Sequence, residues 1–324
     1  MQEDYRKAWI ETFGETSGET SQSQATSANG KGAGKFHPNN QLNDLTGKEW
    51  LKFTKTWFVH SPPSRTQDEI QHPAKFPEGV VQEFIRFFTK RNEWVFDPFM
   101  GVASTLVAAR LEERNAIGIE LVPKYFEISQ KRLQQARSSS TRQFPLLGDA
   151  LKLKEVLGAL WDANPDLPRQ IDFTITSPPY WDMLSKSRGG VESAHKKRAK
   201  QGLDTVYSDD PANLGNIQDY EEFIEKLGQV FDDVYDVTRP GRYLVIIIQN
   251  IRTPEGVVVP CAWDLARRVG RGDKWVFQGE KIWCQENKKL GIWGYPKIFV
   301  PNYHHHYCLI FRKPEKDSAG GHVT

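Results

Sequence analysis

The feature that most constrains the fold is a regular alternation of short apolar runs with helical patterns. We expect strands at seven apolar runs, which are residues 94–97, 116–120, 144–147, 171–176, 243–249, 275–283 and 305–311. We expect six helices, at residues 78–90, 104–114, 123–137, 151–161, 219–237 and 260–269. Such alternation is typical of an α/β fold with a mostly parallel sheet covered by helices on both faces. The last two strands lack a clear intervening helix, so we expect them to form an antiparallel hairpin at one edge.

Composition separates a folded middle from two polar ends. Residues 14–34 carry no large apolar side chain and cannot offset the entropy of ordering. We therefore expect a flexible segment over residues 1–44, one domain over residues 45–313 and a flexible tail over residues 314–324. No apolar run approaches the roughly 18–20 residues that a membrane span needs, and the N-terminus lacks a secretory pattern. Three widely spaced cysteines indicate a reducing, cytoplasmic location.

The loop after the first expected strand is a candidate ligand site. In a sheet of this kind, ligands bind beyond the carboxyl ends of the strands. The segment Asp97-Pro98-Phe99-Met100-Gly101, followed by small Ala103 and Ser104, lets a ligand approach the backbone at a helix N-terminus. It is neither a dinucleotide fingerprint nor a P-loop. Taken alone, an ordinary turn before a helix explains it at least as well.

Carboxylates stand at the ends of the first three strands. Glu120 can accept hydrogen bonds from both hydroxyls of a ribose. Asp149 can accept from an adenine amino group, cap the following helix, or do both. Asp97 either holds an amino group of the cofactor or orients the loop that follows it. Together these residues predict an adenosine pocket without a phosphate cradle, which favours S-adenosylmethionine over a nucleotide.

The fourth strand runs into a candidate catalytic turn, Ser177-Pro178-Pro179-Tyr180. Its two prolines fix φ and remove two backbone donors, which leaves a rigid turn rich in acceptors. The Ser177 hydroxyl and the Pro178 carbonyl can converge on one amino group, while a base stacks on Tyr180. Two acceptors pulling on the N–H bonds favour a pyramidal nitrogen that attacks a sulfonium methyl group in line. A base in a duplex has to leave the stack to reach such a pocket.

The motifs around Asp97 and Ser177 resemble the cofactor and catalytic motifs of the amino-group DNA methyltransferases, which act on N4 of cytosine or N6 of adenine. Residues 72–77, 239–244 and 302–313 extend the resemblance in one consistent order. It implies a Rossmann-like methyltransferase fold, S-adenosylmethionine as cofactor and double-stranded DNA as partner. The implied cofactor contacts are His72, Pro73, Ala74, Lys75, Phe76, Asp97, Pro98, Phe99, Gly101, Ser104, Thr105, Glu120 and Asp149. The implied catalytic residues are Ser177, Pro178, Pro179 and Tyr180.

The choice of target rests on the first residue of the turn. Serine at Ser177 resembles the N4-cytosine members, so a flipped-out cytosine is favoured and N6 of adenine is the alternative. More distant alternatives are methylation of an RNA amino group or a protein amide, and a non-catalytic DNA-binding subunit of a modification complex. The sequence departs from the family at Ala103, often a second glycine, and at Gln249-Asn250, where an acid is often found. The resemblance also allows a restriction-enzyme partner and a prokaryotic or phage origin, and leaves the oligomeric state open.

A basic stretch lies beside the catalytic turn. The whole chain has 43 Lys+Arg and 41 Asp+Glu, a net charge of +2 that does not by itself indicate a polyanionic partner. The insertion at residues 182–218 nevertheless carries six candidate DNA contacts, which are Lys186, Arg188, Lys196, Lys197, Arg198 and Lys200. A solvated charge run is the alternative interpretation. We expect a small phosphate footprint and weak, salt-sensitive binding to random DNA.

Two groups near the last strands have competing interpretations. The run His304-His305-His306 cannot converge on one ion, because alternate side chains of a strand point to opposite faces, so no metal is expected. Trp283, Trp293 and Tyr295 stand near two lysines. They either contact DNA or pack in the core of the last hairpin.

Overall fold

The computed structural model describes residues 35–61, 71, 76–136, 140–181, 210, 212–253, 256–292 and 294–315. Its strands are β1 (Trp57–Val59), β2 (Trp94–Asp97), β3 (Asn115–Glu120), β4 (Gln143–Leu147), β5 (Ile171–Thr176), β6 (Thr238–Ile248), β7 (Ile251–Arg252), β8 (Val258–Val259), β9 (Val276–Cys284) and β10 (His305–Arg312). Its α-helices are α2 (Gly47–Phe53), α4 (Glu78–Phe88), α5 (Ser104–Leu111), α6 (Pro123–Gln135), α7 (Leu153–Ala163), α9 (Tyr220–Val237) and α10 (Cys261–Val269). Two 3₁₀ turns are η1 (Ala150–Lys152) and η2 (Leu214–Asn216).

The main sheet confirms the α/β class. Its strand order is β1-β9-β10-β6-β5-β2-β3-β4, and the five strands from β6 to β4 are parallel. Strand β10 is antiparallel to both of its neighbours, β6 and β9. The carboxyl ends of the parallel strands consequently meet at one edge of the sheet, which we call the carboxyl edge. Candidate ligand residues that follow different strands are thereby brought together.

The expected number of strands is wrong by one. Among the described residues, the sheet has eight strands rather than seven, because β1 pairs in parallel with β9. The β9–β10 hairpin is antiparallel as expected, but it does not form the edge, since β1 lies outside it. A strand of three residues with alternating exposure is too short to produce a recognisable period. Its Phe58 ring packs 6.1 Å from the ring of Phe84 in α4.

Most element boundaries agree with the expectation to within a few residues, and β6 is the exception. It starts at Thr238 rather than at Tyr243. A Pro-Gly pair such as Pro240-Gly241 is typical of a turn, but in the structure both residues lie in a bulge within β6. The register along β5 shifts there, so that Ile171 pairs with Thr238 and Phe173 with Tyr243.

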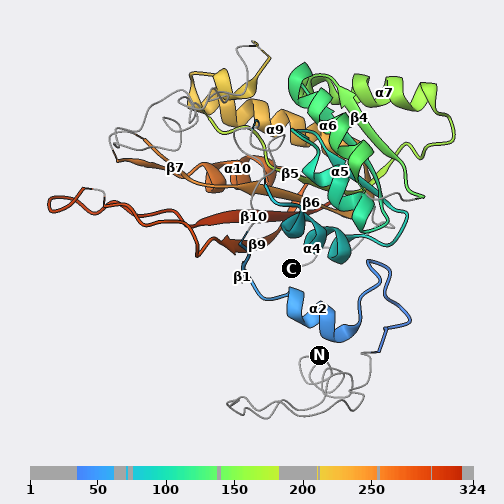
Figure 1. The fold of residues 1–324 in the computed structure, drawn as a ribbon, viewed down its shortest axis with the longest axis horizontal. Coiled ribbons are helices and arrows are strands. Elements are labelled where there is room, and N and C mark those ends of the chain that lie inside the picture. Colours follow the sequence, from blue (N-terminus) through green and yellow to red (C-terminus); the bar gives the residue numbers. More distant parts are fainter. Residues whose placement is uncertain are drawn as a thin grey trace.

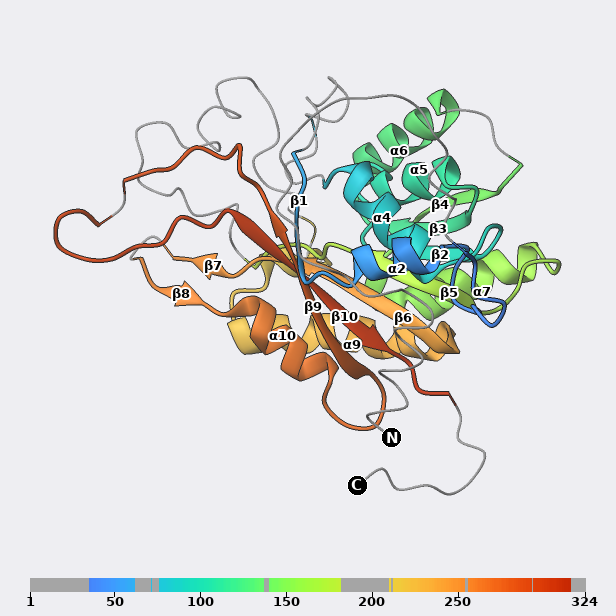
Figure 2. The same ribbon diagram turned by 90° about the horizontal axis from the view of Figure 1, so that it is seen from below.

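Helices cover both faces of the sheet, as Figures 1 and 2 show. One core contains buried residues of α4 and α5, together with Val95, Phe173 and Ile247 from the strands. The other contains buried residues of α7, α9 and α10, together with Phe96 and Ile246. Adjacent strand residues such as Val95 and Phe96 thus face opposite layers, as the pleat requires.

Helix α9 illustrates how the sequence sets these layers. Asp219 caps it by accepting a 2.8 Å hydrogen bond from the Glu222 amide, the position expected for a cap. Phe223, Leu227 and Val230 lie at helical spacing and are fully buried, while the opposite side is charged. Across the described parts of the chain, no helix has the length and apolar character needed to cross a membrane.

Candidate active site

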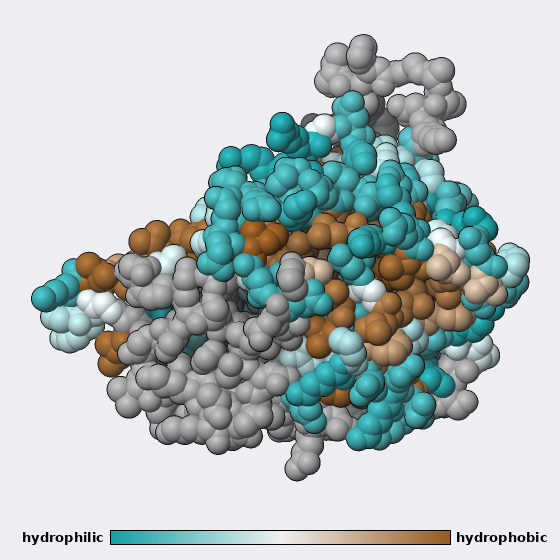
Figure 3. Space-filling model, turned by 90° about the horizontal axis from the view of Figure 1, so that it is seen from above, coloured by the Kyte–Doolittle hydropathy of each residue, from teal (hydrophilic) through white to brown (hydrophobic). Residues whose placement is uncertain are grey.

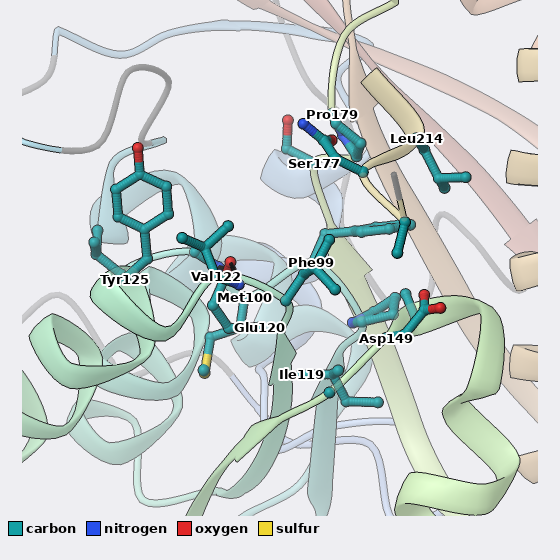
Figure 4. Close-up of a pocket in the computed structure, with 18 of the residues that line it drawn as sticks. Phe99, Met100, Ile119, Glu120, Val122, Tyr125, Asp149, Ser177, Pro179 and Leu214 are labelled. Carbon is teal, nitrogen blue, oxygen red and sulfur yellow. Dashed lines mark hydrogen bonds between the residues drawn. The ribbon is translucent and has the colours of Figure 1, made fainter. Parts of the chain in front are cut away.

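A cavity lies at the carboxyl edge of the sheet, as Figure 4 shows. It encloses about 800 Å³, part of which is open to solvent. Gly101 follows β2, Glu120 ends β3 and Asp149 follows β4, and all three line the cavity. Ser177 and Pro179, which follow β5, line it as well. Several predicted cofactor residues and two residues of the predicted catalytic turn therefore meet in one cavity.

The loop after β2 has an unusual backbone. Gly101 has φ +56° and Ala103 has φ +64°, both in the left-handed region. For alanine this conformation costs about 1–2 kcal/mol, so the surrounding packing holds it in place. The amide of Gly101 donates a 2.8 Å hydrogen bond to Glu120 Oε2, which fastens the loop to the end of β3. The hydroxyl of Ser104, at the start of α5, is buried and finds no partner among the described residues, although Ser104 lines the cavity.

Asp97 orients this loop. Its carboxylate is 0% exposed and accepts hydrogen bonds from the Phe99 amide (3.0 Å), the Thr105 hydroxyl (2.5 Å) and the Thr176 hydroxyl (2.6 Å). Burial raises the pKa of Asp97 from 3.8 to about 6, against the lowering effect of these bonds. Of the two roles considered from sequence, the geometry matches the loop-orienting one. Neither Asp97 nor Thr105 lines the cavity; both lie behind its wall.

Glu120 reaches the cavity from the end of β3. It is 8% exposed, and its two carboxylate oxygens accept 2.8 Å hydrogen bonds from the amides of Gly101 and Val122. Burial raises the pKa of Glu120 from 4.5 to about 7. A carboxylate held by two backbone donors has a fixed orientation, and each oxygen can still accept a further bond.

Asp149 lines the cavity beyond β4. Its Oδ1 accepts a 2.9 Å hydrogen bond from the Leu151 amide and caps η1. The expected helix at this point therefore begins with a 3₁₀ turn before α7. The capping role is confirmed, and Oδ2 takes no part in the cap bond. The adenine contact stays a prediction.

The catalytic turn leaves β5 at Ser177. Pro178 is buried, while Ser177 and Pro179 face the cavity. Burial raises the pKa of Tyr180, and the nearby Ser177 side chain lowers it only in part, so this phenol is neutral at physiological pH. The Tyr180 ring packs against the core rather than lining the cavity.

A wall of the cavity comes from a segment that the sequence did not single out. Ala212, Asn213 and Leu214, at and before η2, line the cavity opposite the cofactor loop. Trp181 ties this segment to the turn, because its Nε1 donates a 2.9 Å hydrogen bond to the Ile217 carbonyl. Other lining residues missed from sequence are Met100, Val102, Ile119, Leu121, Val122 and Tyr125. Several of these follow directly on β2 or β3, which is the signal that could have identified them.

Several predicted site residues lie outside the described residues. They are His72, Pro73, Ala74 and Lys75 of the cofactor set and Lys186, Arg188, Lys196, Lys197, Arg198 and Lys200 of the DNA set. Phe76, the next residue, is described and lines the cavity.

The aromatic residues near the last strands differ in their exposure to solvent. Trp283 is 3% exposed and its Nε1 donates to the His60 carbonyl, so it packs in the core. Tyr295 is 81% exposed. The His306 ring stacks 4.8 Å from Trp283, whereas the His305 ring lies 5.0 Å from Tyr307. Within the described ranges, no cluster of three or more His, Cys, Asp or Glu residues could hold a metal.

Comparison with known families identifies the chain's relatives. The model of the N6_N4_Mtase family, described as DNA methylase, matches residues 6–131 and 171–322. This chain belongs to the DNA methylase family. The two matched blocks contain the loop after β2, Glu120 and the turn at Ser177.

Individual relatives of this DNA methylase match it over shorter stretches. The type II methyltransferase M.BglI of Bacillus subtilis is 35% identical over 120 residues, covering 37% of this chain and 32% of that protein. The orphan methyltransferase M.BamHII of Bacillus amyloliquefaciens is 41% identical over 71 residues, covering 21% and 27%. The type II methyltransferase M.HinfI of Haemophilus influenzae is 36% identical over 96 residues, covering 30% and 23%. The matches thus span about a third or less of these relatives.

Solved structures resemble the DNA methylase only loosely. A putative rRNA methylase from Clostridium thermocellum has a TM-score of 0.44 and 11% identity, covering 74% of this chain and 98% of that one. A putative DNA modification methylase from Thermus thermophilus has a TM-score of 0.32 and 24% identity, covering 55% and 54%. The family assignment rests on the sequence match.

The cofactor of the DNA methylase is S-adenosylmethionine, and the residues of the cavity suit it. Two carboxylates, Glu120 and Asp149, face the cavity, and its described lining contains no Lys, Arg or His. Such a lining favours a sulfonium cation with ribose hydroxyl and amino donors over a phosphorylated nucleotide. The hydroxyl of Ser104, which has no partner among the described residues, is a further polar group at the cavity, at the N-terminus of α5.

Proposed function

We propose that this DNA methylase transfers a methyl group from S-adenosylmethionine to the exocyclic amino group of a base in double-stranded DNA, with N4 of cytosine as the target. One observation carries the proposal. Ser177 and Pro179 line the same cavity as Glu120 and Asp149. A target amino group held at the turn would therefore face a cofactor held by the two carboxylates.

The residues around β3 and β4 bind and orient the cofactor in this proposal. Glu120 accepts the two ribose hydroxyls, and its backbone bonds keep the carboxylate from rotating. Asp149 accepts from the adenine amino group through Oδ2, because Oδ1 is bonded to the Leu151 amide. Ser104 contacts the methionine end. When bound, the cofactor supplies an electrophilic methyl group on a sulfonium.

The residues after β5 position the target amino group. Ser177 can donate its proton to the Tyr180 hydroxyl and keep its lone pairs for an N–H of the base. The Pro178 carbonyl accepts the second N–H. The two prolines hold both acceptors in place without competing donors, so the nitrogen lone pair is directed at the methyl group. The Tyr180 ring packs against the core and does not line the cavity, so stacking on the base would require this ring to turn outward.

Delivery of the target requires the duplex to open. A base that stays stacked inside a duplex cannot place its amino group in an enzyme pocket, so base flipping is part of the proposal. The basic residues of the insertion at residues 182–218 are the proposed phosphate contacts. Restriction-modification is the biological setting suggested by the type II relatives.

N6 of adenine is the second candidate, because the matched family includes both kinds of enzyme. Both bases present an exocyclic amino group conjugated to the ring, so the same turn can serve either one. The identity of the first residue, Ser177, supports cytosine through its resemblance to N4-cytosine members.

The experiment is methyl transfer from labelled S-adenosylmethionine to unmethylated DNA, followed by digestion to nucleosides and mass spectrometry. We expect N4-methyldeoxycytidine from the wild type and strongly reduced product from Ser177→Ala. Exclusive N6-methyldeoxyadenosine would move the target to adenine. If the label appears in RNA or protein and not in DNA, the proposal is contradicted. A protein that binds the cofactor but transfers no methyl group would contradict it as well.

A further inference from the structure

The connection between β9 and β10, residues 285–304, projects well beyond the sheet, and we call it the finger (Figures 1 and 2). Strand β9 is antiparallel to β10, and β10 is antiparallel to β6. The end of β9 therefore points in the same direction as the end of β6. As a result, the finger leaves the sheet at the carboxyl edge, where the cavity lies.

Large apolar side chains are exposed along the finger. The exposed fractions are 78% for Leu290, 87% for Ile292, 81% for Tyr295, 59% for Ile298 and 90% for Phe299. The projection at the left of Figure 3 shows this hydrophobic surface. These five exposed apolar residues lie within ten positions, whereas on an ordinary surface such residues are scattered singly. A cluster of this kind indicates an interaction site.

The finger is nevertheless an ordered hairpin. The Asn302 side chain clamps its two sides together, because Nδ2 donates to the Gly291 carbonyl and Oδ1 accepts from the Gly291 amide, both at 2.9 Å. At the tip, the amides of Lys297 and Ile298 donate to the Gly294 carbonyl at 2.8 and 2.9 Å. The exposed side chains are therefore presented on a defined backbone.

The neighbouring β7–β8 hairpin supports the finger from one side. A side-chain carbon built on Gly256, in the turn of that hairpin, would lie 3.7 Å from Val300 Cγ2 and 4.0 Å from Ile298 Cδ1. This contact uses one side of the finger only. Ile292 and Phe299 remain open to solvent.

Charge identifies the kind of partner. No acidic residue stands between Glu286 and Glu315, and the finger carries Lys288, Lys289 and Lys297, all exposed. A second copy of the chain would bring a surface of the same sign, and like charges oppose such a contact. Lysines interleaved with apolar and aromatic side chains suit DNA, whose phosphates take the lysines while its bases and groove floor take the apolar groups.

We propose that the finger binds duplex DNA beside the target base, with Lys289 and Lys297 on phosphates and Ile292 and Phe299 against the bases. The placement beside the target rests on the proposed function, since it takes the cavity as the site of methyl transfer. The binding itself depends only on the finger.

The test compares two double variants with the wild type. Ile292→Ser/Phe299→Ser removes the apolar contacts, and Lys289→Ala/Lys297→Ala removes the phosphate contacts. All four side chains are exposed, so the fold is retained, and thermal unfolding verifies this. The control variant Lys48→Ala/Leu111→Ser changes a lysine and an apolar residue that are also exposed, Leu111 at 45%, but lie outside the finger.

Duplex binding is followed by fluorescence anisotropy over a range of salt concentrations, with S-adenosylhomocysteine present. We expect the apolar variant to bind roughly tenfold more weakly at every salt concentration. We expect the lysine variant to lower the slope of log Kd against log salt by about two units, one for each phosphate contact. The control should match the wild type.

Wild-type affinity and slope in both finger variants would overturn the proposal while leaving methyl transfer intact. A change in oligomeric state on light scattering, with DNA binding unchanged, would overturn it in favour of a second copy. DNA binding that depends on the finger, without methylation of any DNA, would support the finger and reject the proposed function.

Discussion

The Thr176 hydroxyl donates a 2.6 Å hydrogen bond to the buried carboxylate of Asp97. Asp97 also holds the loop after β2 through the Phe99 amide, and Thr176 directly precedes Ser177. One carboxylate thus connects the cofactor loop to the catalytic turn. In the proposed reaction, the relative placement of the methyl donor and the amino group would depend on this connection, because both sides share Asp97 as their anchor.

We expect Thr176→Val to slow methyl transfer about tenfold or more while changing the affinity for S-adenosylmethionine far less. The substitution keeps the side-chain shape and removes one donor, so the turn loses its link to Asp97 and misaligns with the donor. Single-turnover kinetics and calorimetry measure the two quantities. The control is Thr174→Val on the same strand, because the buried Thr174 hydroxyl has no hydrogen-bond partner in the described structure. Equal effects of the two substitutions would show that the link does not align the turn.

Ser177→Ala and Ser104→Ala should separate catalysis from cofactor binding. Loss of the Ser177 hydroxyl removes an acceptor for the target amino group, so transfer should slow by roughly a hundredfold with nearly unchanged cofactor affinity. Loss of the Ser104 hydroxyl should weaken cofactor binding and leave the transfer rate at saturating cofactor nearly unchanged. Calorimetry and rapid-quench transfer assays give both values. Identical profiles for the two variants would contradict these assignments.

The stability of the protein should depend on pH through Glu120. Its pKa is raised from 4.5 to about 7, so the folded state favours the neutral acid. Its contribution to stability is fully present below the unfolded pKa and is lost as pH rises through about 7. A shift of this size corresponds to about 3 kcal/mol.

Glu120→Gln provides the measurement. The variant is uncharged at every pH, so between about pH 5 and about pH 8 its free energy of unfolding should fall less than that of the wild type. Denaturant unfolding at both pH values gives the difference. Asp97, whose pKa is raised to about 6, titrates in both proteins, and its contribution largely cancels. Parallel pH profiles would assign the dependence to another group.

Two glycines should respond to alanine in opposite directions. A Cβ on Gly118 in β3 would lie 2.7 Å from both Leu106 Cδ1 and Met100 Sδ, so Gly118→Ala should destabilise the fold by about 1–3 kcal/mol. It should also weaken cofactor binding, since Met100 lines the cavity. Gly158, inside α7, has nothing within 4 Å of such an atom, and Gly158→Ala should stabilise by about 0.5–1 kcal/mol. Thermal and denaturant unfolding test both signs, and a stable Gly118→Ala would refute the packing argument.

The site residues at the ends of the parallel strands could be predicted from sequence, because each strand end is visible as the point where an apolar run gives way to small or polar residues. Gly101, Glu120, Asp149 and Ser177 each stand at or just after the end of a different strand, and the parallel topology brings them into one cavity. The wall at Leu214 could not be found in this way. It lies more than thirty positions beyond the turn and reaches the cavity through tertiary packing, for which a single sequence carries no periodic signal.

Burial decided the roles that sequence left open. Asp97 and Glu120 are both acids at strand ends, but only Glu120 reaches the cavity. Trp283 and Tyr295 are near neighbours in the chain, but the first is in the core and the second is exposed. Each pair shares a chemical class, acidic in the first and aromatic in the second, so the position of the side chain relative to the sheet decides its role.

The three-residue strand β1 has a consequence for how molecules of this protein meet one another. Without it, residues 282–284 of β9 would present unpaired backbone groups, and a free strand edge is a template on which another chain can extend a sheet. β1 occupies that edge, and the ammonium of buried Lys281 binds the carbonyls of Phe53 and Lys55 just before it. A strand so short offers little for a further chain to pair with. The segment that sequence periodicity could not reveal thus protects the sheet from edge-to-edge aggregation.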